Sequence, residues 1–281
     1  MTIGPREDAI LGPIATALPE GRLDLERSLE IADLLSPADV PRPVLRRLHE
    51  RSGIDTRGVA IIASDGSIPL YGIAPSGRSS TPRRPGTAER MHAYAGAAVD
   101  LAVTAALGAL EASDTPVESV THLVTASCTG FGAPGVDLAV MERLRLPASV
   151  QRTNVGFMGC HAAVNALTVA RALAAESHAN RVLVVCVEIS TVHFHHDLRM
   201  DRLISNILFA DGAGATVVGG PGNDQSPKRL VTTASRLIPD SKGAMAWEVG
   251  DHGFEMTLAA EVPDLIAAAL GEWVDEVLDA H

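Results

Sequence analysis

Residues 151–165 read QRTNVGFMGCHAAVN and place Cys160 directly after a glycine and directly before a helical pattern. A thiol is a nucleophile only as the thiolate, and the free N–H groups of a helix N-terminus favour that negative charge. Gly156 and Gly159 permit a tight strand-to-helix turn, and the same N–H groups could hold the oxyanion formed on a thioester carbonyl. An inert core cysteine explains a lone Gly-Cys pair equally well, so both interpretations stay open on these residues alone.

The two other cysteines are typical of packing. Cys186 lies in the continuous apolar run LVVCVEI, the pattern of a strand buried on both faces of a sheet. Cys128 ends a predicted strand beside a glycine-containing loop, where it could also line the same cavity as Cys160. Three cysteines, an odd number without Cys-x-x-Cys spacing, indicate reduced thiols and a cytoplasmic protein.

Strands and helices alternate around these cysteines, which predicts an α/β fold with a mixed sheet covered on both faces. We expect a mobile loop over residues 64–86, which are rich in Ser, Pro, Gly and Arg. The predicted helices are 24–35, a segment ending at Ser52 before Gly53, 87–111, 136–145, 161–176 and the last segment from Glu261 onward. The predicted strands are 58–63, 120–127, 150–153, 181–190 and 229–238, and residues 205–220 begin as a helix and end as a strand.

The composition excludes several classes of protein. The chain has 281 residues, of which 46% are hydrophobic, and a net charge of −11. Nucleic acid is therefore not expected as a partner, because phosphate binding needs a basic surface. No run approaches the ~18 consecutive apolar residues of a membrane helix, and the start, MTIGPREDAI, lacks the regions of a signal peptide.

Several motifs in order and at matching spacing resemble one known family. GFMGCHAAVNALTVARAL, RVLVVCVEIS, LFADGAGATVVGG, VTHLVTASCTGFGAPGVDLAVMERLRLP and LRRLHERSGIDTRGVAI are similar to segments of the type III polyketide synthases, which are chalcone-synthase-like members of the thiolase superfamily. The resemblance runs from about residue 24 to the end of the chain. It implies a thiolase-like, layered αβαβα fold, with a first half over residues 1–221 and the beginning of a second half over 222–281.

The resemblance also implies a function and residue roles. Cys160 stands at the position of the nucleophile that takes an acyl group from an acyl-CoA starter before decarboxylative condensation with malonyl-CoA. Phe209 matches the aromatic gatekeeper, and Arg47 and Arg51 match basic positions that meet the coenzyme A phosphates. The spacing of the two arginines agrees independently, because i and i+4 share one helix face. The substrates are coenzyme A thioesters and no cofactor is expected.

Three further positions carry over from the family with departures. Ser190 and His193, in VEISTVHF, match positions that line the reaction cavity and influence the choice of starter. Ala133 stands where plant members place a methionine that reaches into the partner subunit, and the family forms homodimers. His193, Ala133 and Val44, which replaces a third basic residue, all differ from the plant enzymes, so the starter and product cannot be borrowed from them.

Two family residues find no match in this sequence. The catalytic histidine of a His-Pro-Gly-Gly stretch and the catalytic asparagine of a Gly-Asn pair come after the point where the printed sequence stops. An alternative hypothesis is therefore a truncated, catalytically impaired chain that acts as a binding or dimerisation partner. A second alternative is a ketoacyl-synthase-like condensing enzyme, which shares a nucleophile at a helix start.

Two other patterns could indicate a metal site and a nucleotide site. HFHHD at 193–197 could suggest a metal, but zinc sites need three or four ligands, and the sequence offers no second set. We therefore expect no metal. DGAGATVVG lacks the third glycine of a dinucleotide-binding loop and runs into a strand, so we expect no nucleotide there.

Overall fold

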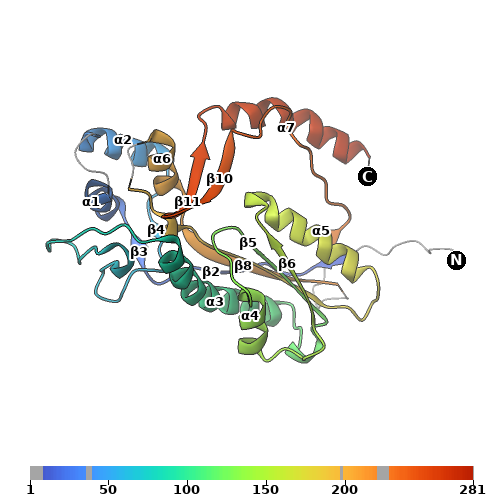
Figure 1. Cartoon of the computed structure of the whole chain (residues 1–281). Helices are drawn as coiled ribbons and strands as arrows, with labels where there is room; N and C mark the ends of the chain where they lie inside the picture. Colours follow the sequence, from blue (N-terminus) through green and yellow to red (C-terminus); the bar gives the residue numbers. More distant parts are fainter. Residues whose placement is uncertain (1–8, 36–39, 197–198, 220–227, 281) are drawn as a thin grey trace. The chain divides into compact units, whose positions relative to one another are not determined.

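The computed structural model of the chain describes residues 9–35, 40–196, 199–219 and 228–280 (Figure 1). The α-helices are α1 (Leu25–Leu35), α2 (Arg42–Ser52), α3 (Thr87–Ala112), α4 (Val136–Leu144), α5 (Ala162–Ala174), α6 (Met200–Leu208) and α7 (Val262–Asp279). The strands are β1 (Ala9–Leu11), β2 (Ala15–Ala17), β3 (Arg22–Leu23), β4 (Arg57–Gly58), β5 (His122–Ser127), β6 (Gln151–Gly156), β7 (Val182–Ile189), β8 (Asp211–Val218), β9 (Lys228–Leu230), β10 (Met245–Gly250) and β11 (Gly253–Leu258).

The chain folds into two compact units built from interleaved segments. Unit 1 comprises the described residues of Met1–Leu18, Ala95–Glu188 and Gly212–Ala234, and unit 2 comprises those of Pro19–Tyr94, Ile189–Asp211 and Ser235–His281. The predicted boundary between residues 221 and 222 lies outside the described residues. The division of the chain into family halves therefore stays a prediction.

Unit 1 contains a mixed seven-stranded sheet in the order β6-β5-β7-β8-β1-β9, with β2 also paired to β8. Strands β6, β5 and β7 run parallel, whereas β1 and β2 are antiparallel to β8. The register pairs Ser127 with Gly156 and Ala126 with Cys186, so the carboxyl ends of three neighbouring strands meet at one edge of the sheet. In parallel sheets this edge is where ligands and reactive groups gather.

Helix α5 lies against β5 and β6 and buries Ala162, Ala166 and Ala170. Alanines four residues apart form one flat face, which permits close helix–sheet contact. The helix predicted at 161–176 is thus confirmed with slightly shorter bounds, and a 3₁₀ turn over Gly159–His161 precedes it. Cys160 lies in this turn, directly ahead of α5.

Unit 2 has its own apolar core. One cluster contains Leu23, Ile31, Leu35, Val59, Ile68, Tyr71, Ile73 and Phe194. A second cluster joins Leu29 of α1, Leu45 of α2 and Leu203 of α6. Helix α2 ends at Ser52 because Gly53 adopts the left-handed conformation (φ 68°), as the sequence predicts.

Some predictions about strands were wrong. The apolar run at 58–63 does not form a strand, because only Arg57–Gly58 pairs with β3. Val59 instead enters the apolar core from a turn, which explains the apolar composition. The strand at 229–238 is reduced to β9, which pairs with β1 in the sheet of unit 1 rather than opening a new sheet. The hairpin of β10 and β11 was not predicted.

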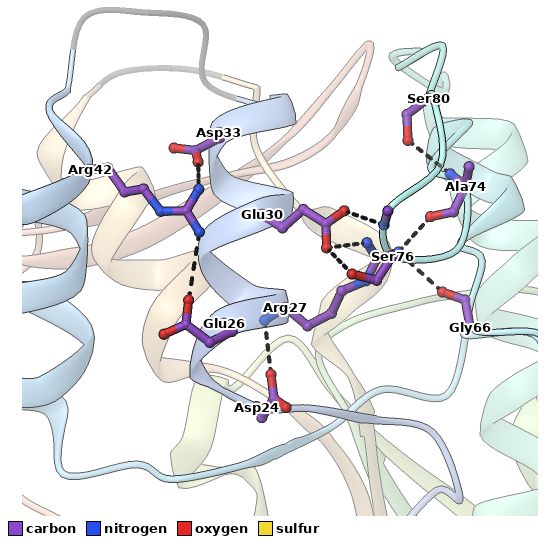
Figure 2. Close-up of polar contacts among 11 residues, drawn as sticks. Asp24, Glu26, Arg27, Glu30, Asp33, Arg42, Gly66, Ala74, Ser76 and Ser80 are labelled. Atoms are coloured by element: carbon purple, nitrogen blue, oxygen red, sulfur yellow. Dashed lines mark hydrogen bonds and ion pairs between the residues drawn. The ribbon is translucent and has the colours of Figure 1, made fainter.

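The loop at 64–86, predicted to be mobile, is held by side chains of α1 (Figure 2). Arg27 donates hydrogen bonds to the carbonyl oxygens of Gly66 (3.2 Å) and Ala74 (2.6 Å). Glu30 pairs with Arg27 at 2.7 Å and accepts a hydrogen bond from the Ser76 hydroxyl at 2.7 Å. This segment therefore has more fixed contacts than its composition indicates.

Helix α3 passes a test of length and composition for a membrane-spanning helix, which corrects the statement that no segment approaches one. Half of its most apolar window is buried within the fold. The buried residues include Ala98, Ala102, Ala105 and Ala109, with no exposed side chain surface at these positions. A buried core helix passes the same test, so the finding is weak evidence for a membrane.

Candidate active site

The turn that carries Cys160 has an unusual backbone. After β6 ends at Gly156, Phe157 adopts a positive φ of 60° and Gly159 one of 61°. A positive φ is uncommon for a bulky residue, so the chain reverses sharply here at some conformational cost. The turn leaves Cys160 exposed and free of any disulfide, ahead of the helix that begins at Ala162.

Cys128 lies directly behind this turn. Its side chain is buried, and its sulfur donates a hydrogen bond to the carbonyl oxygen of Gly159 at 3.4 Å. Burial raises the pKa of the Cys128 thiol, and the charge of Glu188 raises it further. The burial of Cys128 and its contact with Gly159 give this thiol a supporting position behind the turn.

Glu188, at the end of β7, ties the segment that follows β5 to the sheet. Its carboxylate accepts hydrogen bonds from the backbone N–H groups of Cys128 (2.9 Å) and Thr129 (2.9 Å). It also accepts bonds from the hydroxyl groups of Thr129 at 2.6 Å and Ser127 at 3.3 Å. Burial raises the pKa of this carboxyl group, although the hydrogen bonds oppose the shift.

Sequence reasoning missed Glu188. The available signal was an acidic residue inside the run LVVCVEI, since a carboxylate in a buried strand needs several donors to offset its desolvation. Cys186, two residues earlier, is half-buried in β7, and burial raises its pKa to about 11. The prediction that Cys186 has a packing role agrees with this position.

Apolar side chains surround the turn on the surface of unit 1. Phe131 and Phe157 are 50% and 56% exposed and meet edge-to-face with ring centroids 6.2 Å apart. Met158 is 50% exposed, and Ala133 lies in the same exposed segment as Phe131. Exposed apolar groups beside a nucleophile fit contact with an acyl chain or with another protein surface.

Unit 2 holds the remaining predicted residues. Arg47 and Arg51 are exposed on α2, and no described residue forms an ion pair with either guanidinium group. The neighbouring Arg46 pairs with Glu26 at 2.8 Å, and Arg42 pairs with Asp33 at 2.7 Å. The positive charge on α2 that is available to an anionic ligand therefore comes from Arg47 and Arg51, because Arg42 and Arg46 are already paired.

Ser190 and His193 begin and end a 3₁₀ turn that directly follows β7. His193 is buried and stacks on Phe254 at a centroid distance of 4.1 Å, and its Nδ1 accepts a hydrogen bond from the Phe254 backbone at 3.1 Å. Phe254 in turn stacks on Trp247 at 4.5 Å. His193 is thus a packed aromatic neighbour of the β10–β11 hairpin.

Asp211, which sequence reasoning also missed, fixes this turn. It accepts hydrogen bonds from the Thr191 backbone (2.9 Å) and hydroxyl (2.6 Å) and from the Ala60 backbone (2.7 Å). Burial raises its pKa to about 6. Phe209 precedes it by two residues, directly after α6, and is half-buried.

Unit 2 also contains a polar groove beside α1. This groove, of about 690 Å³, is lined by Arg27, Glu30, Arg42 and residues of the 65–76 segment, but the ion pairs described above already neutralise these groups (Figure 2). Among the described residues, no three His, Cys, Asp or Glu side chains gather as metal ligands would. Asp197 of the HFHHD segment lies outside the described residues.

Comparison with known proteins defines the class. The structure superposes on PKS-I from the brown alga Ectocarpus siliculosus with a TM-score of 0.87 and 27% identity, covering 100% of this chain and 75% of that one. It superposes on the C-terminal type III polyketide synthase domain of Steely1 from Dictyostelium with a TM-score of 0.85 and 26% identity, covering 97% and 74%. The fold is therefore the thiolase-like α/β fold of the type III polyketide synthases.

Sequence comparison narrows the class to a family. The profile of chalcone and stilbene synthases, N-terminal domain, matches residues 78–222. An alpha-pyrone synthesis polyketide synthase-like protein of Mycobacterium tuberculosis is 30% identical over 98% of this chain and 68% of its own length. A probable polyketide synthase of Dictyostelium discoideum is 32% identical over 64% of this chain, which is 6% of that much longer protein. The chain belongs to the chalcone and stilbene synthase family of type III polyketide synthases, a family of acyl-transferring enzymes.

Replacing Glu188 tests its role in holding the turn. Glu188→Ala leaves several buried donors without an acceptor, so we expect it to lower the free energy of unfolding by roughly 2–4 kcal/mol. Glu188→Gln keeps one acceptor oxygen, so its loss should be smaller. Urea denaturation measures both, with the exposed Glu176→Ala as the control. Equal and negligible losses for both Glu188 variants would contradict this role.

Proposed function

We propose that this chain is an acyltransferase in which Cys160 takes an acyl group from a coenzyme A thioester for condensation with malonyl-CoA. The observation that carries the proposal is the contrast among the three cysteines. Cys160 is exposed at the start of α5, whereas Cys128 is buried and Cys186 is half-buried within the sheet. Family membership supports the same assignment.

The proposed chemistry has two stages. The Cys160 thiolate attacks the thioester carbonyl, the carbon–sulfur bond to coenzyme A breaks, and coenzyme A leaves as its thiol after taking up a proton. Malonyl-CoA then loses carbon dioxide, and the resulting carbanion attacks the acyl group on Cys160 and releases the thiolate. The first turn of a helix has N–H groups without intrahelical partners, which suits it to stabilise the oxyanion.

Other residues take proposed roles from the resemblance. Arg47 and Arg51 would bind the phosphates of coenzyme A, and this role is supported by their exposure and by the absence of an ion pair with any described residue. Phe209 would act as a gatekeeper, and Ser190 and His193 would contribute to starter selection. Asp211 would act as a positioning residue, because its hydrogen bonds to Thr191 fix the turn that carries them.

A second candidate function is acyl binding without condensation. The chain spans 68% of the length of its mycobacterial relative and 74–75% of the lengths of the two structural neighbours. In this second function Cys160 would still accept an acyl group, but no carbon dioxide would be released from malonyl-CoA. Release of labelled carbon dioxide therefore separates the two functions.

An acyl-enzyme assay tests the role of Cys160. After incubation with a panel of acyl-CoA starters, we expect one acyl group on the tryptic peptide 153–171, labile to hydroxylamine. The adduct should be lost in Cys160→Ala and retained in Cys186→Ser, as intact-mass and peptide mass spectrometry would show. An adduct on Cys186, or none with any starter, would contradict the proposal.

Charge reversal on α2 tests phosphate binding. We expect Arg47→Glu together with Arg51→Glu to weaken coenzyme A binding by at least about tenfold, or ~1.4 kcal/mol, because two cations become anions. Calorimetric titration at low and high salt measures the affinity, and Arg143→Glu, at an exposed ion pair of unit 1, is the control. If the α2 variant and the control bind alike, this assignment is wrong.

We also propose that the protein forms a homodimer through unit 1. Strand β6 is an edge strand with exposed residues from Gln151 to Asn154, and exposed edges are ready to pair with another chain. Unit 1 also exposes the apolar side chains of Phe131, Phe157 and Met158, and the last two directly follow β6. Sedimentation velocity should show a two-chain mass, and a single-chain mass at all concentrations would refute the dimer.

The cytoplasmic location remains a prediction.

A further inference from the structure

Cys128 and Cys160 come close together although 31 residues separate Cys128 from Gly159 in sequence. The parallel register pairs Ser127 with Gly156, so the segments leaving β5 and β6 start side by side. The Cys128 sulfur then reaches the carbonyl oxygen of Gly159 at 3.4 Å. Gly159 is bonded to Cys160, so standard peptide dimensions put this sulfur within about 6 Å of the Cys160 Cα.

The two thiols differ in access. Cys160 is exposed, whereas Cys128 is 7% exposed and lies beneath the turn. An oxidant from solvent therefore meets Cys160 first, and the buried Cys128 thiol is a second sulfur in contact with the same turn. Burial and Glu188 both raise the pKa of Cys128, which further separates the roles of the two cysteines.

The turn has room to bring the sulfurs together. In the part of the chain that the structure describes, no atom apart from the chain neighbours of Gly159 lies within 4 Å of the position that a Cβ would occupy there, and none of the residues Gly159–His161 is buried. A disulfide requires Cα atoms 4.4–6.8 Å apart, and the 3.4 Å contact already places the Cys128 sulfur against Gly159, the residue bonded to Cys160. A small movement of an exposed 3₁₀ turn costs far less than a movement of the packed sheet.

We propose that Cys128 and Cys160 form a reversible intramolecular disulfide when the protein meets a hydroperoxide. The Cys160 thiolate attacks the peroxide oxygen, the O–O bond breaks, and Cys160 becomes a sulfenic acid while the peroxide leaves as water or an alcohol. The Cys128 sulfur then attacks the sulfenic sulfur, and its proton leaves with the hydroxyl group as water. A dithiol reductant restores both thiols by exchange.

Such a pair would protect the nucleophile. A sulfenic acid without a neighbouring thiol is oxidised onward to sulfinic acid, which ordinary thiols do not reduce. With Cys128 behind the turn, oxidation stops at the disulfide and the nucleophile is recoverable. The inference stands independently of acyl transfer, since the disulfide is measured by mass and not by activity.

The three cysteines lie on separate tryptic peptides, 91–143, 153–171 and 182–199, so the pairing can be read directly. After brief treatment with dilute hydrogen peroxide and blocking of free thiols, we expect a loss of two hydrogens and a cross-link between the first two peptides. Dithiothreitol should reverse it. Cys186→Ser should form the same cross-link as the wild type, and each variant should have the melting temperature of the wild type.

The variant Cys128→Ser gives the opposite expectation, because Cys160 then has no resolving thiol. We expect it to gain two oxygens on peptide 153–171, in a form that dithiothreitol does not reverse. Cys128→Ala provides the same test if the serine perturbs the turn. The proposal is overturned if the wild type becomes irreversibly oxidised as fast as Cys128→Ser, if Cys160 pairs with Cys186, or if the cross-link joins two chains.

Discussion

The Glu188 carboxylate is the interaction on which the candidate active site depends. It gathers the N–H groups and hydroxyls of residues 127–129 at the edge where β5, β6 and β7 end. Because this fixes Cys128, and Cys128 contacts Gly159, the exposed turn before α5 has support from the sheet. The carboxylate is costly to bury, which its raised pKa reflects, and the hydrogen bonds offset that cost.

Unit 2 uses the same physical device at a different place. Asp211 begins β8, is buried, and accepts hydrogen bonds from Thr191 and Ala60, so one carboxylate holds the turn carrying Ser190 and His193. Its pKa is raised to about 6 by burial. In both units an acidic residue, half-buried Glu188 or buried Asp211, organises an irregular segment that follows a strand. Ser190 and His193 stand on one of these segments, and Cys128, which contacts the turn of Cys160, stands on the other. The backbone N–H groups of such segments donate hydrogen bonds to side chains, because they have no partners in a β-sheet or a helix.

Local patterns in the sequence predicted the regular elements well. Strands β5 and β7 and helices α3, α5 and α7 follow from apolar runs and helical spacing, and the end of α2 follows from the glycine stop at Gly53. These are properties of neighbouring residues. The run at 58–63 misled the prediction because burial in a turn and burial in a strand require the same apolar composition. Short strands such as β1 and β9 depend on partners far away in the chain and leave little local trace.

The candidate site was predictable only in part. The glycines and the following helix made Cys160 a candidate nucleophile but left an inert core cysteine equally possible, and only the family resemblance pointed to Cys160, Arg47 and Arg51 together. Glu188 and Asp211 were not, because their importance comes from donors on other strands and turns, which only the register brings together. The proximity of Cys128 to the nucleophile turn likewise follows from the pairing of Ser127 with Gly156 and from nothing in the local sequence.

The central claim is that this fold presents one thiol to solvent and withholds the other two. The most direct measurement is the rate of alkylation of each cysteine by iodoacetamide in the folded protein, followed peptide by peptide. We expect Cys160 to react fastest by a wide margin, and Cys128 and Cys186 to react only after denaturation. Equal rates for the three cysteines, or faster reaction at Cys128 or Cys186, would contradict it.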